Sequence, residues 1–146
     1  MRTVLIIVVT GILFSACKKD VVMPVEPSIE LISIGPTDVL QFHDVVTLRF
    51  KYKDGDGDIG EVDADAPSLR VKDSRLAEPD WYHIQPIAPI GSSVPIEGEV
   101  SLNLNTLFLI GNGSQEALTF SIRLKDRAGN YSNELVSQTI LIHDSL

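Results

Sequence analysis

In the segment from Val45 to Tyr52, apolar and polar side chains alternate without interruption from Val46 onward. The apolar positions are Val46, Leu48, Phe50 and Tyr52. Because successive side chains of an extended chain point to opposite faces, this alternation predicts a β-strand with one buried face and one wet face. Strands of this kind favour antiparallel sheets in which one side is open to water.

Six further segments have the same character, and residues that favour turns separate them. They are residues 29–34, 68–73, 81–87, 99–105, 117–126 and 135–142. About seven short strands joined by Gly, Pro, Asn and Asp predict an all-β fold, specifically an immunoglobulin-like antiparallel β-sandwich. The segment 107–115 can instead form one helical turn.

The charge balance limits the kinds of partner. The chain has 146 residues, with 20 acidic and 12 basic side chains and a formal net charge of −8. This argues against nucleic-acid binding, because duplex binders need clustered Lys and Arg to displace counterions. It is compatible with cation binding. Cys17 is the only cysteine, so no disulfide can form within the chain.

The beginning of the chain has the features of a processed leader. Arg2 precedes an apolar run from Val4 to Phe14, which is too short to span a bilayer. Two small residues then precede Cys17, and this arrangement resembles the bacterial lipoprotein signal, although Phe14 stands where leucine is usual. The resemblance implies that residues 1–16 are a signal peptide and that Cys17 is lipidated.

We therefore expect a lipid anchor at Cys17, a tether over residues 17–28 and one domain over residues 29–146. Two or three acyl chains hold a protein firmly at a membrane without spanning it. The expected location is the bacterial cell envelope, at the outer membrane. The alternatives are an ordinary signal peptide with an incidental cysteine, or a buried N-terminal helix.

A concentrated acidic turn follows the strand that ends near Tyr52. We call residues 54–60 the acidic loop; it contains Asp54, Asp56 and Asp58, separated by glycines that let alternate side chains converge. Calcium binds six to eight oxygens at about 2.3–2.6 Å, so three carboxylates and nearby carbonyls can supply most of its shell. Asp63 and Asp65 are possible additional ligands.

The spacing is similar to the start of an EF-hand loop, but two positions exclude that motif. Ile59 occupies the position that requires glycine, and Asp65 stands where a bidentate glutamate is expected. The element before the loop is also a predicted strand rather than a helix. Zinc is disfavoured because no cysteine and no histidine cluster is available near the loop.

A second polar loop lies between the last two predicted strands. We call residues 126–133 the Asp126 loop; Asp126 and Asn130 are its candidate metal ligands. In an immunoglobulin-type sandwich the second-to-third and sixth-to-seventh strand loops share one end, so the two loops are expected to face each other. The alternative is that both are solvated turns, since Asp and Gly are common turn residues.

The motifs "F-x-Y-x-DGDGDIG" and "D-RAGN-x-SN" together resemble a group of uncharacterised lipoproteins from Bacteroidota that carry an immunoglobulin-like or cadherin-like domain. The resemblance covers nearly the whole chain after the leader. It implies the fold and a location at the cell surface or in the periplasm, rather than an activity.

No sequence context for catalysis is apparent, and a carboxylate cluster in one turn suits a metal better than an acid–base pair. We expect a non-enzymatic envelope protein with a structural Ca²⁺ site, acting as a binding or structural module for an unknown protein or glycan. The alternative is a carbohydrate-binding accessory lipoprotein. Trp81 and Tyr82 are the possible glycan contacts; being adjacent on a strand, they face opposite sides.

Overall fold

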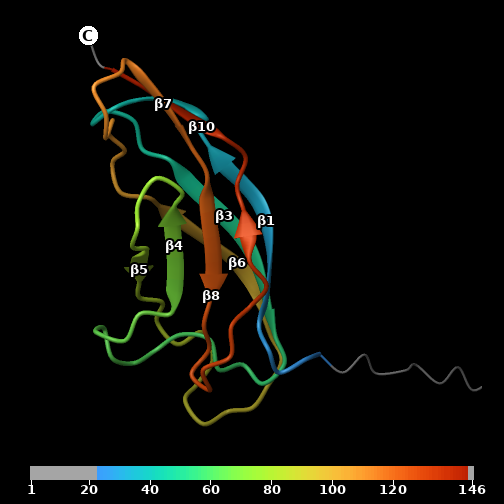
Figure 1. Cartoon of the computed structure of the whole chain (residues 1–146). Coiled ribbons are helices and arrows are strands. Elements are labelled where there is room, and N and C mark those ends of the chain that lie inside the picture. The colour runs from blue at the N-terminus through green and yellow to red at the C-terminus, as the bar shows by residue number, and fades with distance from the viewer. Residues whose placement is uncertain (1–22, 145–146) are drawn as a thin grey trace, which may run out of the picture.

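A computed structural model describes residues 23–144 of the chain. The predicted signal peptide over residues 1–16 and the predicted lipidation at Cys17 lie outside the described residues. Ten strands are present (Figure 1): β1 (Ser28–Gly35), β2 (Asp38–Leu40), β3 (Thr47–Asp54), β4 (Leu69–Asp73), β5 (Asp80–Tyr82), β6 (Ile96–Asn103), β7 (Gln115–Leu118), β8 (Phe120–Leu124), β9 (Leu135–Val136) and β10 (Ile140–His143).

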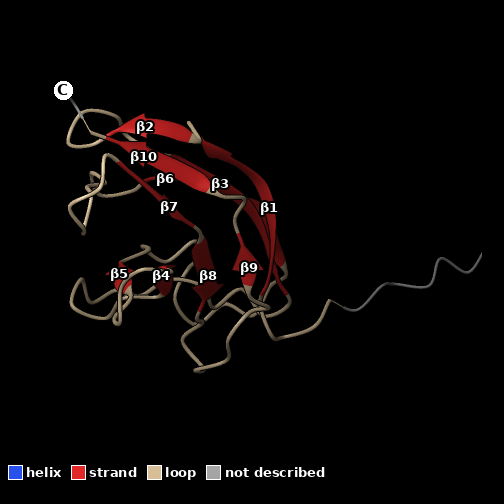
Figure 2. Cartoon of the chain, turned by 45° about the horizontal axis from the view of Figure 1, so that its top comes forward, coloured by secondary structure: helices blue, strands red, loops and turns tan. Residues whose placement is uncertain are grey.

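The strands form three small sheets, ordered β1-β3-β6, β2-β10-β7 and β5-β4-β8-β9 (Figure 2). Every pairing is antiparallel except that of β2 with β10, which is parallel. The prediction of an all-β fold with mostly antiparallel strands is therefore confirmed. It follows from the alternation in the sequence, because β3 buries every second residue from Leu48 onward.

One hydrophobic core joins the three sheets. It takes inward-facing side chains from each of them, including Phe50 of β3, Ile122 of β8 and Ile142 of β10, all fully buried. Burying such side chains contributes roughly 1.5–3 kcal/mol each relative to exposure. Within residues 23–144, the clustered core residues all lie between Ile29 and Ile142.

Two of the predicted strands are divided in the structure. The segment 117–126 changes sheet at Thr119, so that β7 pairs with β10 while β8 pairs with β4 and β9. The Thr119 carbonyl accepts a hydrogen bond from the Ser74 N–H, and the Thr119 N–H donates one to the Ser74 hydroxyl. Both backbone groups of Thr119 are therefore paired with Ser74 at the break between β7 and β8. The segment 135–142 is likewise divided into β9 and β10.

The alternative of a helical turn over residues 107–115 is wrong, since this segment is irregular up to β7. Glu116 explains its shape, because its carboxylate accepts hydrogen bonds from the backbone N–H groups of Ile110 and Gly111. Among residues 23–144, no helix has the length and apolar character needed to cross a membrane.

Candidate metal site

Asp54 is buried because of its register in β3. The inward face of this strand runs Leu48, Phe50, Tyr52, and Asp54 continues the same alternation at the strand's last position. Its side chain is 0% exposed. A charged group at such a position costs much free energy unless opposite charge or strong donors surround it.

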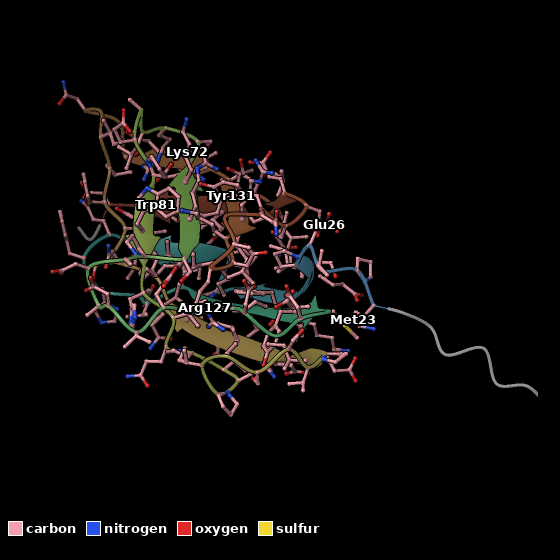
Figure 3. The ribbon with its side chains drawn as sticks, turned by 90° about the horizontal axis from the view of Figure 1, so that it is seen from below. Met23, Glu26, Lys72, Trp81, Arg127 and Tyr131 are labelled. Carbon is pink, nitrogen blue, oxygen red and sulfur yellow. The ribbon has the colours of Figure 1, made fainter. Side chains whose placement is uncertain are left out.

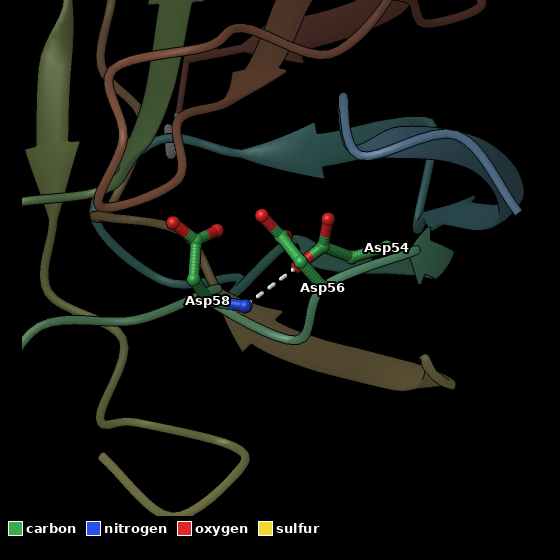
Figure 4. Close-up of side chains that lie close together, drawn as sticks. All are labelled: Asp54, Asp56 and Asp58. Atoms are coloured by element: carbon green, nitrogen blue, oxygen red, sulfur yellow. Dashed lines mark hydrogen bonds between the residues drawn. The ribbon is translucent and has the colours of Figure 1, made fainter. Parts of the chain in front are cut away.

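The turn that follows brings the other two carboxylates back toward Asp54. The backbone N–H of Asp58 donates a 2.8 Å hydrogen bond to Asp54 Oδ2 (Figure 4). Gly57 has a φ of 74°, and a side chain there would overlap the carbonyl oxygen of Val94. Asp54, Asp56 and Asp58 each place one oxygen so that the three atoms lie within 4.8 Å of one another.

The described residues satisfy these carboxylates only in part. The Oδ1 atoms of Asp54, Asp56 and Asp58 are all buried, and none accepts a hydrogen bond from the described residues. Buried polar atoms in native proteins normally have partners, so three unpaired anionic oxygens in one turn require an explanation.

The electrostatic consequence appears in the acidity of the cluster. Burial, and then the carboxylates of Asp56, Asp58 and Asp126, raise the pKa of Asp54 to about 6, although the hydrogen bond from Asp58 opposes this. Burial and the neighbouring carboxylates of Asp126 and Asp56 also raise the pKa of Asp58, against the effects of Ala128 and Arg127. The cluster thus carries more negative charge than its own surroundings neutralise.

The structure brings the Asp126 loop against the acidic loop. Ile59 and Asp126 form an isolated antiparallel bridge. The backbone N–H groups of Arg127 and Ala128 donate to the Asp58 carbonyl at 3.2 Å and to Asp58 Oδ2 at 3.0 Å. The Arg127 side chain also donates to the Gly60 carbonyl at 2.8 Å. The second loop therefore holds Asp58 in position.

The two predicted ligands of that loop are bound mainly to each other. Asp126 is buried and accepts hydrogen bonds from the Asn130 backbone at 2.7 Å and from its side-chain amide at 2.9 Å. Asp126 is close enough to raise the pKa values of Asp54 and Asp58, but it does not belong to the group of three converging oxygens.

Asp63 and Asp65 lie apart from the cluster. Both are exposed, and the backbone N–H of Asp65 donates to Asp63 Oδ1, so the pair forms a local turn. The structure therefore does not bring the two additional candidate ligands to the site.

The possible glycan contacts separate as neighbours on a strand should. Trp81 is 42% exposed, whereas Tyr82 packs against the core. Tyr131, which the sequence analysis did not select, is also 42% exposed and lines a shallow surface depression with Trp81. No local pattern identifies Tyr131, because strand pairing alone brings it close to Trp81.

A further contact involves the end of the predicted tether. A Cβ atom on Gly55 would overlap the backbone carbonyl oxygens of Met23 and Pro24, so these residues lie directly on the acidic loop. Figure 1 shows the N-terminal segment entering the domain at the end where the β3–β4 connection lies. In the sequence, Gly55 was the one sign of this contact with Met23 and Pro24, but a glycine there also fits an ordinary turn.

The donor set determines which chemistry the site can support. It consists of carboxylate oxygens, and such hard donors suit Ca²⁺, Mg²⁺ or Mn²⁺. Two oxygens on opposite sides of a calcium ion are separated by up to about 5 Å, which fits the observed cluster.

The comparisons with known proteins add no assignment. No family model, no curated protein and no solved structure matches this chain. The coarse result is an all-β protein with an acidic Asp54, Asp56 and Asp58 cluster, and the resemblance to a lipoprotein group remains a prediction.

Proposed function

We propose that the acidic loop binds one Ca²⁺ ion and that this ion is a structural part of the domain. Two observations on the same three carboxylates carry the proposal: each has a buried oxygen that accepts no hydrogen bond from the described residues, and each places one oxygen within 4.8 Å of the others. A divalent cation neutralises them where hydrogen-bond donors do not. Asp54, Asp56 and Asp58 are the ligands of this proposal.

Asp126 and Asn130 support the site from the adjacent loop. Asp126 adds negative potential at the cation, while its hydrogen bonds to Asn130 keep the loop folded. With Asp58 held by Ala128, a bound cation connects the two loops and reduces their motion. The role is one of stabilisation, and no residue is assigned a catalytic step.

The wider proposal is a non-enzymatic, lipid-anchored protein of the bacterial cell envelope, at the outer membrane. Its support is the lipoprotein-like leader ending at Cys17. An immunoglobulin-like sandwich remains our proposal for the topology, supported by the meeting of the two loops and by one core shared among the sheets. Such a domain acts as a binding or structural module for a protein or glycan.

Thermal unfolding of the chain from Lys18 onward tests the calcium site, because this chain retains every core residue among those that the structure describes. At 100 times its dissociation constant, a ligand stabilises the folded state by about 2.7 kcal/mol, which corresponds to a rise in Tm on the order of 10 °C. Calcium should produce this rise after treatment with a chelator.

Asp56→Asn should abolish the calcium-dependent rise. Asp63→Asn is the matched control, since it removes a neighbouring exposed aspartate outside the cluster. The proposal is wrong if millimolar calcium leaves the Tm of the wild-type protein unchanged, or if both variants lose the rise equally.

The carbohydrate-binding alternative is favoured by a specific observation as well. Trp81 is exposed on the surface of the β5-β4-β8-β9 sheet, near a second exposed aromatic side chain. The class of glycan that the surface around Trp81 would bind depends on the charged side chains beside this aromatic residue.

A further inference from the structure

The outer surface of the β5-β4-β8-β9 sheet carries a concentration of positive charge in an acidic protein. Residues of β4 and β8 alternate, so that one set enters the core and the other faces outward. We call the outward group the basic face; its cations and aromatic side chains are Arg70, Lys72, Trp81, Arg123, Lys125 and Tyr131.

Strand register places these side chains in adjacent rows. Arg70 lies opposite Trp81 on one side and opposite Arg123 on the other. One row further along, Lys72 lies opposite Ser121. At the other end, Lys125 forms a bridge with Tyr131. The cations therefore extend along the sheet, with an aromatic ring near each margin.

The basic face is poorly neutralised by the protein itself. Its nearby carboxylate is Glu134, whose oxygen lies 3.5 Å from Arg70. Lys72, Arg123 and Lys125 form no ion pair with any residue in 23–144. Like charges directly opposite each other on a sheet are destabilising, so the Arg70–Arg123 pair has a cost that the contacts of Arg70 with Glu134 and of Arg123 with Ser132 and Tyr131 must offset.

The aromatic rings are held in exposed positions. The Arg123 guanidinium lies 5.0 Å from the centroid of the Tyr131 ring and also donates hydrogen bonds to the Ser132 carbonyl, which fixes the ring's position. Trp81, Lys125 and Tyr131, with Pro67, line one shallow depression. Figure 3 shows Lys72, Trp81 and Tyr131 on one part of the surface, away from Met23.

We propose that the basic face binds an acidic polysaccharide, a chain of pyranose rings that carry carboxylate or sulfate groups. Trp81 and Tyr131 offer flat apolar surfaces for sugar rings, and the lysines between and beside them offer partners for the anionic groups. A face with aromatic rings and no deep groove suits an extended glycan better than an acidic peptide.

Binding of hyaluronan oligosaccharides, which carry a uronic acid on alternate rings, tests this proposal directly. Trp81 is the only tryptophan, so its fluorescence reports on this face alone. At low salt, hyaluronan should change that fluorescence and give a saturable titration, whereas the neutral glucan maltoheptaose should not. Raising the salt concentration should weaken binding, because the partners are charged.

The combined substitution of Lys72→Glu and Lys125→Glu should weaken hyaluronan binding at least tenfold, and Trp81→Ala should do the same in a calorimetric titration. Lys51→Glu is the matched control: Lys51 is an exposed strand lysine on the β1-β3-β6 sheet, and its change should leave affinity within twofold. Melting temperatures verify that each variant is folded.

Three outcomes would overturn the proposal. The first is no binding of hyaluronan or chondroitin sulfate at low salt. The second is equal weakening by Lys51→Glu, which would indicate nonspecific attraction. The third is binding of polyglutamate as tightly as hyaluronan without a change in Trp81 fluorescence, which would identify an acidic polypeptide as the partner. None of these results depends on calcium binding at the acidic loop.

Discussion

Two regions of this domain bury carboxylates, and they differ in how the negative charge is neutralised. At one, Arg75 lies between Asp73 and Glu116, with hydrogen bonds of 2.7 Å and 2.6 Å. At the other, Asp54 is fully buried among acidic side chains and has an oxygen without a partner. The first region contains its own counterion.

The Arg75 cluster shows how this chain neutralises buried carboxylates with a cation of its own. Arg75 is only 13% exposed, and its planar group bonds both carboxylates and also the Phe108 carbonyl. Among the described residues, no comparable cation enters the acidic loop, since the Arg127 side chain donates to backbone carbonyls instead. We infer that the acidic loop obtains its positive charge from solution.

Loss of Arg75 is expected to give the largest effect. Arg75→Met leaves the buried Asp73 carboxylate and the partly exposed Glu116 carboxylate without their counterion. Breaking a fully buried ion pair costs about 3–5 kcal/mol, so this partly exposed cluster should lose about 2–3 kcal/mol. Chemical denaturation should measure a loss of this order, and calcium should not restore it. A loss below about 1 kcal/mol would show that the Arg75 cluster is not internally compensated.

The pH dependence of the metal-free protein should have opposite signs at the two regions. The folded-state pKa of Asp54 is raised to about 6, so the folded protein holds this proton more tightly than the unfolded chain does. The contribution of protonated Asp54 to the free energy of unfolding is therefore fully present below pH 4 and is lost as the pH rises through 6. In a chelator, this group alone should reduce stability by up to about 3 kcal/mol between pH 4 and 7.

Glu116 should act in the other direction. Hydrogen bonds from Gly111 and Ile110, and then Arg75, lower the pKa of Glu116, so its stabilisation is present above pH 4.5 and is lost as the pH falls. Urea unfolding across this range, repeated with Asp54→Asn and Glu116→Gln, separates the two contributions. If Asp54→Asn leaves the pH profile unchanged, the buried charge assigned to Asp54 is incorrect.

Asp54→Asn should also reverse the usual relation between a substitution and stability. Without calcium at pH 7, the neutral amide should stabilise the fold by about 1–2 kcal/mol, because it removes a repelled charge while keeping the side-chain shape. With saturating calcium, the variant should be the less stable protein, since it has lost a ligand. Calorimetric scans in chelator and in calcium compare the two states; a variant that is less stable in both would contradict the prediction.

The smallest effect is expected at the contact with the N-terminal segment. Gly55→Ala should displace Met23 and Pro24 without disturbing the core, at a cost of about 1 kcal/mol or less. Backbone NMR relaxation should show increased motion at Val25 and Glu26, which unlike Pro24 and Pro27 carry an amide proton, and little change in β3. Gly91→Ala is a control at a glycine where an added Cβ atom would meet no other residue. The φ of 82° at this position would strain the alanine, so some loss of stability is expected there as well.

The period-two alternation was sufficient to predict most of the β-structure. It identified β3 and the inward positions of β4 and β8, because burial on one face imposes that pattern. It could not predict the change of sheet at Thr119, since both halves of that segment alternate in the same way.

The candidate site was only partly predictable for a similar reason. Asp54, Asp56 and Asp58 converge through a local turn, so their spacing in the sequence contained the information. The long-range partners did not have such a signal. Arg75 meets Glu116 across 41 positions, and Trp81 meets Tyr131 only through the pairing of separate strands.

The close contact of Met23 and Pro24 with Gly55 has a consequence for how the domain would be oriented at a membrane. If a lipid on Cys17 holds the chain, the roughly six residues up to Met23 reach at most about 20 Å. The end of the domain that carries the acidic loop would then face the headgroups, where anionic lipids enrich divalent cations, and the end of β10 would point outward. If the loop binds calcium as proposed, loss of the ion would leave two negatively charged surfaces facing each other, so the cation would also influence how the domain is oriented on the membrane.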